Sequence, residues 1–225
     1  MIRNVKEGIL HLQKDPAINR VLPEDRTAEL AALLERYIGE IELFNPAYGL
    51  VGAKDRAELI TKHILDSLAP LGIIAGLLER YAAPQIADVG SGAGLPGIPL
   101  AIALPRFHFT LIERMGRRAG FLRNTIAVLG LNQVTVEETE MEKAGPGRFD
   151  LATFRAFRPL EPPILRNLFR LLSPGGTLAA YKGRREAIEK EMAGVDAGPW
   201  ESIPCPVPGL AEERHLLVIH LPKKQ

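Results

Sequence analysis

The sequence contains very little cysteine. Cys205 is the one cysteine among 225 residues, so no disulfide can form within the chain. The histidines and Cys205 do not show the spacing of zinc ligands, and we expect no metal site. Low cysteine usage is typical of a reducing compartment, which predicts a cytoplasmic protein.

Long hydrophobic runs and a large net charge are also missing. No apolar run is read as long enough to span a membrane, and residues 1–7 lack the apolar core of a signal peptide, so we expect no membrane partner. The 28 Lys and Arg residues nearly balance the 27 Asp and Glu residues, which leaves a formal net charge of +1. Arginines nevertheless gather in 106–123 and 148–185. Such segments are compatible with a nucleic-acid surface and equally with solvated helix faces.

The chain has a helical first part and an alternating second part. Apolar residues recur with helical spacing over 24–44, residues 45–49 predict a break, and Asp55–Glu58 predicts a capping box at the start of another helix. From residue 85 onward, strand patterns alternate with helix patterns, and the last two strands have no helix between them. The predicted strands are 85–90, 107–112, 133–137, 149–154, 176–181, 200–205 and 214–221, and the predicted helices between them are 96–104, 116–129, 159–172 and 184–193.

This order predicts an α/β fold. Alternating strands and helices form a mostly parallel sheet with helices on both faces, and two final strands without a helix form a terminal antiparallel hairpin. We therefore expect an N-terminal helical extension over 1–82, followed by an α/β domain over 83–225.

The most informative segment is Asp88–Pro99, whose sequence is DVGSGAGLPGIP. It follows a predicted strand and precedes a predicted helix, and its glycines would let a ligand approach the backbone closely. Glu113 ends the next strand, sixteen residues after Gly97, where an acid suits a ribose hydroxyl pair. Together these features predict a cofactor that contains a nucleoside.

Two cofactor classes fit this segment. Residues 92–97 match the G-x-G-x-x-G pattern of dinucleotide sites, and residues 88–94 match the D-x-G-x-G-x-G loop of S-adenosylmethionine-dependent methyltransferases. A pyrophosphate needs free N–H groups at the helix start, and Pro96 and Pro99 remove two of them. S-adenosylmethionine carries no phosphate and is therefore favoured. A nicotinamide-dependent oxidoreductase and a turn without a ligand are the alternatives.

Four polar side chains outside this segment are further candidates. Arg155 and Lys182 end the fourth and fifth predicted strands, and ligands of open α/β sheets bind beyond the carboxyl ends of the strands. His63 and Asp66 lie one turn apart on a predicted helix. They could cover the mouth of a cofactor site or form a hydrogen-bonded structural pair.

Six segments, taken in order, resemble the RsmG family, also called glucose-inhibited division protein B. These are bacterial 16S ribosomal RNA guanine-N7 methyltransferases, and the combination of H-I-L-D-S with G-L-P-G-I-P is the specific part of the resemblance. The segments are Lys62–Leu68, Asp88–Pro99, Arg117–Arg123, Phe154–Phe157, Tyr181–Gly183 and Arg214–Ile219.

The resemblance implies a class I, Rossmann-like methyltransferase that acts in rRNA processing. The methyl donor would be S-adenosyl-L-methionine, with S-adenosyl-L-homocysteine as product, and the partner would be 16S rRNA or the small ribosomal subunit. We expect a monomer. A module on the same fold that binds a nucleoside or RNA without catalysis is an alternative, because fold does not fix function.

The resemblance also implies which residues contact the cofactor. They are Gly90, Gly92, Gly94, Leu95, Glu113, Arg114, Met115, Glu140, Met141 and Arg155. N7 of guanine carries a free lone pair and needs no general base, so the four polar candidates would orient the target rather than exchange protons. They are Arg155, Lys182, His63 and Asp66. The sequence departs from the family pattern at Val51, Phe154 and Met141.

Overall fold

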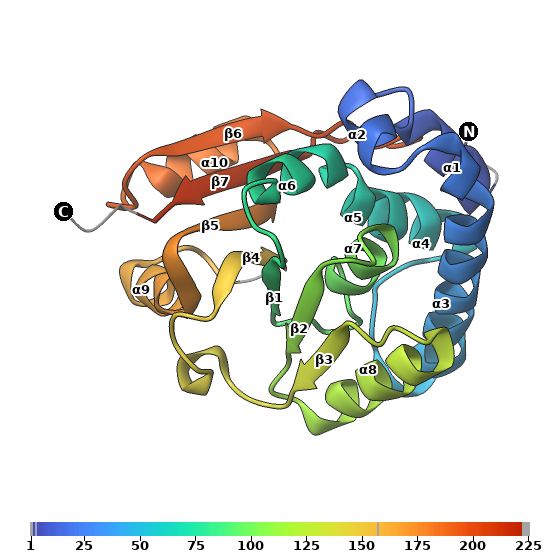
Figure 1. Ribbon diagram of the computed structural model, residues 1–225, viewed down its shortest axis with the longest axis horizontal. Helices are drawn as coiled ribbons and strands as arrows, with labels where there is room; N and C mark the ends of the chain where they lie inside the picture. Colours follow the sequence, from blue (N-terminus) through green and yellow to red (C-terminus); the bar gives the residue numbers. More distant parts are fainter. Residues whose placement is uncertain (1, 3, 157, 222–225) are drawn as a thin grey trace.

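Seven strands form one sheet at the centre of the computed structural model, which describes residues 2, 4–156 and 158–221 (Figure 1). The strands are β1 (Gln85–Val89), β2 (His108–Ile112), β3 (Val134–Glu137), β4 (Phe149–Arg155), β5 (Leu172–Lys182), β6 (Trp200–Pro204) and β7 (His215–His220). Their order across the sheet is β3-β2-β1-β4-β5-β7-β6. β1 to β5 are parallel, and β7 runs antiparallel to both of its neighbours. The predicted parallel sheet with a terminal antiparallel hairpin is confirmed.

Helices precede the sheet and then alternate with its strands. Before the sheet lie α1 (Val5–Leu12), α2 (Pro16–Val21), the 3₁₀ helix η1 (Glu24–Arg26), α3 (Thr27–Tyr48), α4 (Arg56–Leu59), the π-helix η2 (Ile60–Leu65), α5 (Asp66–Leu68) and α6 (Leu71–Leu78). Among the strands lie α7 (Gly97–Ala103), α8 (Gly116–Leu129), the 3₁₀ helix η3 (Met141–Lys143), α9 (Pro162–Leu171) and α10 (Arg185–Met192). β5 begins earlier than predicted because Leu172 already pairs with Phe149, ahead of a register shift.

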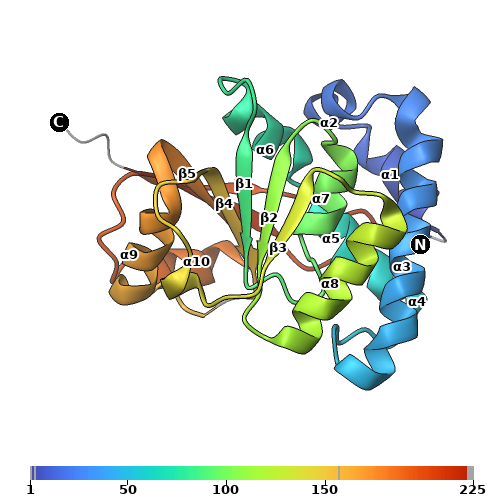
Figure 2. The same ribbon diagram turned by 60° about the horizontal axis from the view of Figure 1, so that its bottom comes forward.

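Helices cover both faces of the sheet, as Figure 2 shows, with α9 and α10 on one side and α3, α7 and α8 on the other. Successive strand residues point to opposite faces. In β1, Ile86 packs into the larger core, which it shares with the helices before the sheet. Ala87 and Val89 pack into the core formed with α9 and α10. The two hydrophobic cores together fix the carboxyl edge of the sheet in place.

Helix α3 runs further than the sequence predicts. The break expected over 45–49 falls at the end of that segment, because α3 continues through Pro46 and ends at Tyr48. A proline removes one N–H from the helix, and so close to the end few hydrogen bonds are lost. Gly49 then ends the helix with a φ of 58°, and the Asn45 side chain accepts hydrogen bonds from the N–H groups of Leu50 and Val51 at 2.7 and 2.9 Å.

Residues 56–78 form one continuous helical run of α4, η2, α5 and α6. Its start is confirmed as a capped helix end, since the Asp55 side chain accepts a hydrogen bond from the Glu58 N–H at 2.8 Å. By length and composition the run could span a membrane, which corrects the expectation that no segment is long enough. However, 67% of its apolar window is buried inside the protein, as in the core helix of a globular domain.

The boundary predicted near residue 82 falls in the segment between α6 and β1. The helices on its N-terminal side do not form a separate core, because they share one with α7 and α8. A hydrogen bond of 2.7 Å from the Tyr37 hydroxyl to the Ala93 carbonyl joins α3 to the turn after β1. The division into 1–82 and 83–225 stays a prediction about domains, and the packing makes the two parts mutually dependent.

Candidate functional site

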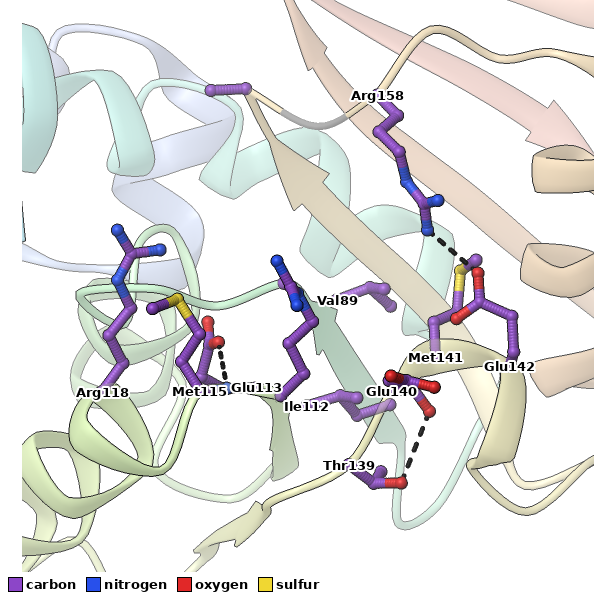
Figure 3. A pocket seen from close by; sticks show the side chains of 13 residues that line it. Val89, Ile112, Glu113, Met115, Arg118, Thr139, Glu140, Met141, Glu142 and Arg158 are labelled. Carbon is purple, nitrogen blue, oxygen red and sulfur yellow. Dashed lines mark hydrogen bonds and ion pairs between the residues drawn. The ribbon is translucent and has the colours of Figure 1, made fainter.

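A cavity of about 580 Å³ opens at the carboxyl ends of β1 to β4 (Figure 3). This is the edge where ligands bind in open α/β sheets, and the volume lies within the range of roughly 300–1,000 Å³ found for small-molecule sites. The lining residues are Val89, Gly90, Ile112, Glu113, Arg114, Met115, Arg118, Thr139, Glu140, Met141, Glu142, Ala156 and Arg158.

The turn between β1 and α7 needs its glycines. Gly90, Gly92 and Gly94 have φ values of 69°, 59° and 90°, which residues with a side chain rarely adopt. A Cβ atom on Gly94 would also lie 2.5 Å from Cδ1 of Ile98. The turn therefore brings bare backbone to the edge of the cavity at Gly90.

The N–H groups at the start of α7 already have acceptors within the protein. The Gly97 N–H donates to Oδ2 of Asp88 at 3.0 Å, and the Ile98 N–H donates to the carbonyl of Gly94 at 2.7 Å. Pro96 has no N–H. The helix start consequently lacks the row of free donors that would hold a pyrophosphate.

Glu113 connects the turn after β1 to the turn after β2. Its Oε2 accepts a hydrogen bond from the Gly92 N–H at 2.9 Å, and its Oε1 accepts one from the Met115 N–H at 2.8 Å. Only 4% of the residue is exposed, yet it lines the cavity. A carboxylate can accept about four hydrogen bonds, so these two leave capacity for hydroxyl groups of a ligand.

Asp88 is fully buried beneath the same turn. Its Oδ2 accepts hydrogen bonds from the Ser91 hydroxyl at 2.6 Å and from the Gly97 N–H at 3.0 Å, while its Oδ1 has no partner among the described residues. Burial raises the pKa of Asp88 to about 6, against the lowering effect of those two bonds. Asp88 therefore fixes the turn at the cost of a buried charge.

The far rim of the cavity follows β4. Ala156 has a φ of 49°, the one positive value at a non-glycine among the described residues, and strained backbone of this kind concentrates at functional sites. Arg158 reaches Oε1 of Glu142 on η3 at 2.9 Å, and Figure 3 shows this ion pair at the rim of the cavity.

Arg155, the last residue of β4, lies in a separate group of side chains. Its Nη1 donates to Oδ2 of Asp66 at 3.0 Å and to the carbonyls of Lys62 and His63 at 3.2 and 3.5 Å. Its Nη2 lies 3.1 Å from Nδ1 of His63. Asp66 also accepts from Nε of Arg214, just before β7, at 3.1 Å. We call Lys62, His63, Asp66, Arg155 and Arg214 the Arg155 cluster.

The Arg155 cluster is largely withdrawn from solvent. The side chains of Asp66 and Arg155 are 7% and 15% exposed. Burial, and next the charge of Arg155, lower the pKa of His63 to about 4, so the imidazole is neutral at physiological pH. His63 lies in the π-helix η2, a rare geometry that is frequent at functional sites.

Lys182 has a different environment from the one expected for a residue facing the cofactor. Its Nζ lies 2.8 and 2.7 Å from the two carboxylate oxygens of Glu191 on α10. Glu191 also accepts a hydrogen bond from the Leu160 N–H at 2.8 Å. Lys182 does not line the cavity, and its ion pair fastens α10 to the end of β5.

Apart from Lys182, which pairs with Glu191, the predicted site residues fall into three places, and their roles stay predictions. Around the cavity lie Gly90, Glu113, Arg114, Met115, Glu140 and Met141. Beside it, in the turn, lie Gly92, Gly94 and Leu95, whereas Arg155, His63 and Asp66 form the cluster. Sequence reasoning missed Val89, Ile112, Arg118, Thr139, Glu142, Ala156 and Arg158. All of them except Arg118 end a strand or follow one within five residues, so a wider window at each strand end would have found them.

Comparison with known proteins relates the chain to one family. The profile of the GidB family, described as rRNA small subunit methyltransferase G, matches residues 30–217. A ribosomal RNA small subunit methyltransferase G from Treponema pallidum (strain Nichols) is 41% identical over 221 residues, covering 96% of this chain and 92% of its own. One from Stenotrophomonas maltophilia (strain K279a) is 41% identical over 196 residues, covering 85% of this chain and 87% of its own.

A solved structure shares the fold at low sequence identity. It is a Methanococcus maripaludis protein assigned by inference as an S-adenosyl-L-methionine-dependent methyltransferase. The TM-score is 0.57 and the identity 15%, with 84% of this chain and 93% of that chain covered. The predicted fold class, a Rossmann-like methyltransferase fold preceded by helices, is confirmed.

Proposed function

The chain belongs to the GidB family, rRNA small subunit methyltransferase G, and from this premise we propose that it methylates ribosomal RNA with S-adenosylmethionine as donor. The acceptor we propose is N7 of one guanine in the 16S RNA of the small ribosomal subunit. We further propose that the protein acts as a monomer in the cytoplasm.

The observation that carries this proposal is the cavity between the glycine turn and the strand ends. Glu113 has acceptor capacity for ribose hydroxyls, Gly90 offers bare backbone, and the apolar Met115 and Met141 suit the faces of an adenine ring. These residues fit S-adenosylmethionine, which supplies an electrophilic methyl carbon on a sulfonium sulfur when bound. Gly92, Gly94 and Leu95 would hold the shape of the turn.

The hydrogen bonds at the start of α7 support this donor over a nicotinamide dinucleotide. The Gly97 and Ile98 N–H groups already have acceptors and Pro96 has no N–H, so no set of donors there awaits a pyrophosphate. The overlapping glycine pattern in the sequence fits both cofactors, and the bonding of the turn supports S-adenosylmethionine.

The proposed acceptor limits what the protein must do. N7 attacks with its own lone pair, so the side chains have to align the reactants rather than remove a proton. The target guanine has to be accessible, because proteins read RNA bases mainly in loops, bulges and single strands. Arg114, Arg118 and Arg158 at the cavity provide positive charge for the RNA backbone. Binding to phosphates then weakens steeply as salt rises.

Methyl transfer to small ribosomal subunits that lack N7-methylguanine tests the proposal. Labelled S-adenosylmethionine is the donor, and chemical cleavage at N7-methylguanine maps the product. Label in one guanine of the 16S RNA is the expected result. Binding of S-adenosylhomocysteine without any transfer would overturn the proposed reaction and favour a module that binds without catalysis.

A further inference from the structure

We propose that His63 reads the target guanine by donating a hydrogen bond from Nε2 to O6 of the base. The inference rests on the proposed methyl transfer to guanine N7 and adds the residue that would recognise the acceptor. It arises from the contact between His63 and Arg155, which fixes the donor and acceptor roles of the imidazole.

The Arg155 contact determines where the imidazole carries its proton. A guanidinium can only donate, so Nδ1 of His63, 3.1 Å from Nη2 of Arg155, has to accept. A neutral imidazole has one N–H, which must then be on Nε2. Burial and the adjacent Arg155 keep the pKa of His63 at about 4, and His63 is therefore a neutral Nε2–H donor at physiological pH.

The Nε2 atom of His63 is available to a ligand. The one hydrogen-bond contact of its ring runs from Nδ1 to Arg155, among the residues that the structure describes. Nε2 is also absent from the buried polar atoms that lack a partner, so it reaches solvent although the residue is half-buried. Its donor is consequently free while its acceptor is occupied.

His63 does not line the cavity itself, but it contacts the last residue of β4, the strand whose end borders the cavity. If the adenine lies at the end of β3 and the ribose at Glu113, the methyl group lies toward the ends of β1 and β4. Ala156 lines the cavity there, and Arg155 precedes it directly. His63 contacts Arg155 in turn, and the proposal has the acceptor approach the methyl group from beyond β4, beside His63.

The neutral charge of this donor suits the proposed chemistry. The edge of guanine that carries N7 also carries the acceptor O6, whereas adenine has an amino group in that place. A donor on O6 selects guanine and leaves the N7 lone pair free. A neutral donor also adds no positive charge beside a ring that becomes cationic on methylation.

The cations near this end of the sheet have other partners. Arg155 has four hydrogen-bond contacts within its cluster, and Arg214 is bound to Asp66. Lys182 is bound to both carboxylate oxygens of Glu191. Among the side chains predicted to orient the target, His63 is the one whose donor is neutral.

Two substitutions distinguish the role of Nδ1 from the role of Nε2 in His63. His63→Asn keeps an acceptor near Nδ1 for Arg155 and lacks any group at Nε2, whereas His63→Gln places an amide donor near Nε2 and lacks the Nδ1 acceptor. Initial rates of transfer to unmethylated small subunits, the affinity for S-adenosylhomocysteine and the melting temperature are measured for both variants and the wild type.

We expect His63→Asn to lower kcat/KM by about 10- to 100-fold, as for one lost hydrogen bond to the transition state. His63→Gln should be at least about fivefold more active than His63→Asn, with cofactor affinity and melting temperature of both close to wild type. Equal activities of the two variants, or full activity of His63→Asn, would overturn the role of His63. Wild-type protein that transfers no methyl group would instead overturn the proposed function.

The pH profile of the wild type provides a test that does not depend on variants. The charged groups near His63 are Arg155, Arg214 and, on its own helical run, Glu58, Lys62 and Asp66. With His63 neutral throughout, and with Asp88 ionised above its pKa of about 6, kcat/KM should be constant between pH 7 and pH 8. A change of kcat/KM with pH in that range, present in the wild type and absent from His63→Gln, would show that His63 titrates. It would overturn the role of His63 as a fixed neutral donor.

Discussion

The carboxyl edge of the sheet has two halves that are built differently. At the ends of β1 to β3 and just beyond β4, backbone turns and single side chains surround an open cavity, and Glu113 bonds to N–H groups of neighbouring turns. At the ends of β4 and β5, buried side chains from distant elements bond to one another, with Asp66 between Arg155 and Arg214.

The two halves of the edge therefore differ in how they obtain their shape. The cavity half obtains its shape from local sequence, since the glycines of one turn and the acid of the next strand suffice. The cluster half obtains its shape from partners that are 89 and 148 positions apart along the chain. Removal of a buried charge from the cluster should therefore destabilise the whole fold, whereas surface substitutions at the cavity should have small effects.

Asp66→Ala is expected to have the largest effect on stability. It removes one carboxylate and leaves two guanidinium groups without their shared partner, at a side chain that is 7% exposed. Loss of one member of a buried ion pair costs about 3–4 kcal/mol, because an unpaired charge stays buried. Urea unfolding at pH 7 measures this loss. If the free energy of unfolding fell by less than about 1 kcal/mol, the Arg155 cluster would not be what holds the N-terminal helices to the sheet.

Asp88→Asn tests the buried charge under the cavity half. The wild-type pKa is raised from 3.8 to about 6, so protonated Asp88 favours the folded state. That contribution is complete below pH 3.8 and is lost as pH rises through about 6. Relative to the wild type, Asp88→Asn should therefore gain about 2–3 kcal/mol between roughly pH 3.5 and pH 7. Urea unfolding across this range gives the difference, and parallel curves for the two proteins would contradict the raised pKa.

Gly97→Ala should have an intermediate effect, because it crowds the same turn. A Cβ on Gly97 would lie 2.5 Å from Cδ2 of Leu111 and 2.6 Å from Oδ2 of Asp88. Overpacking of this kind costs about 2 kcal/mol, and it should also weaken binding of S-adenosylhomocysteine, measured by calorimetry. Gly120→Ala is the matched control, since a Cβ there meets nothing within 4 Å on α8. Equal stability of both variants would show that the turn can widen.

Most of the fold and half of the site follow from the sequence. Strand and helix periodicity predict the sheet, and the turn at 88–99 with Glu113 predicts the position of the cavity, because each signal is local. Pro46 misleads, since only the position of a proline relative to the true helix end decides whether it breaks the helix. The polar residues within 56–78 hide the length of this apolar helical run in the sequence. Their hydrogen-bond partners, such as those of Asp66, lie far away along the chain.

The other half of the site could not be predicted from local patterns. Arg155, Asp66 and His63 were candidates, but that they bond to one another depends on how the first helices pack against the sheet. Lys182 was expected at the cofactor for its strand-end position, and its partner Glu191 lies on the following helix. The position of a residue at a strand end thus predicts that its side chain lies at the carboxyl edge of the sheet. It does not predict which residue that side chain bonds to.

Glu142→Gln should have the smallest effect, although it also breaks an ion pair. The Arg158 and Glu142 side chains are 58% and 39% exposed, and ion pairs in such surroundings contribute about 0.5 kcal/mol or less at moderate salt. A hydrogen bond from its own backbone, and next the bond from Arg158, lower the pKa of Glu142. The small contribution is thus present above the ordinary pKa and disappears as pH falls through the lowered one.

The matched control for Glu142→Gln is Glu189→Gln, which breaks the pair with Arg185 on α10, away from the cavity, where the side chains are 65% and 52% exposed. Urea unfolding of both variants at low and high salt should show two small losses that shrink further as salt rises. A loss near about 3 kcal/mol for Glu142→Gln alone would mean that the rim pair is as strong as the Asp66 pairs. Burial would then not be what distinguishes the two halves of the edge, and the cavity rim would contribute to the stability of the fold.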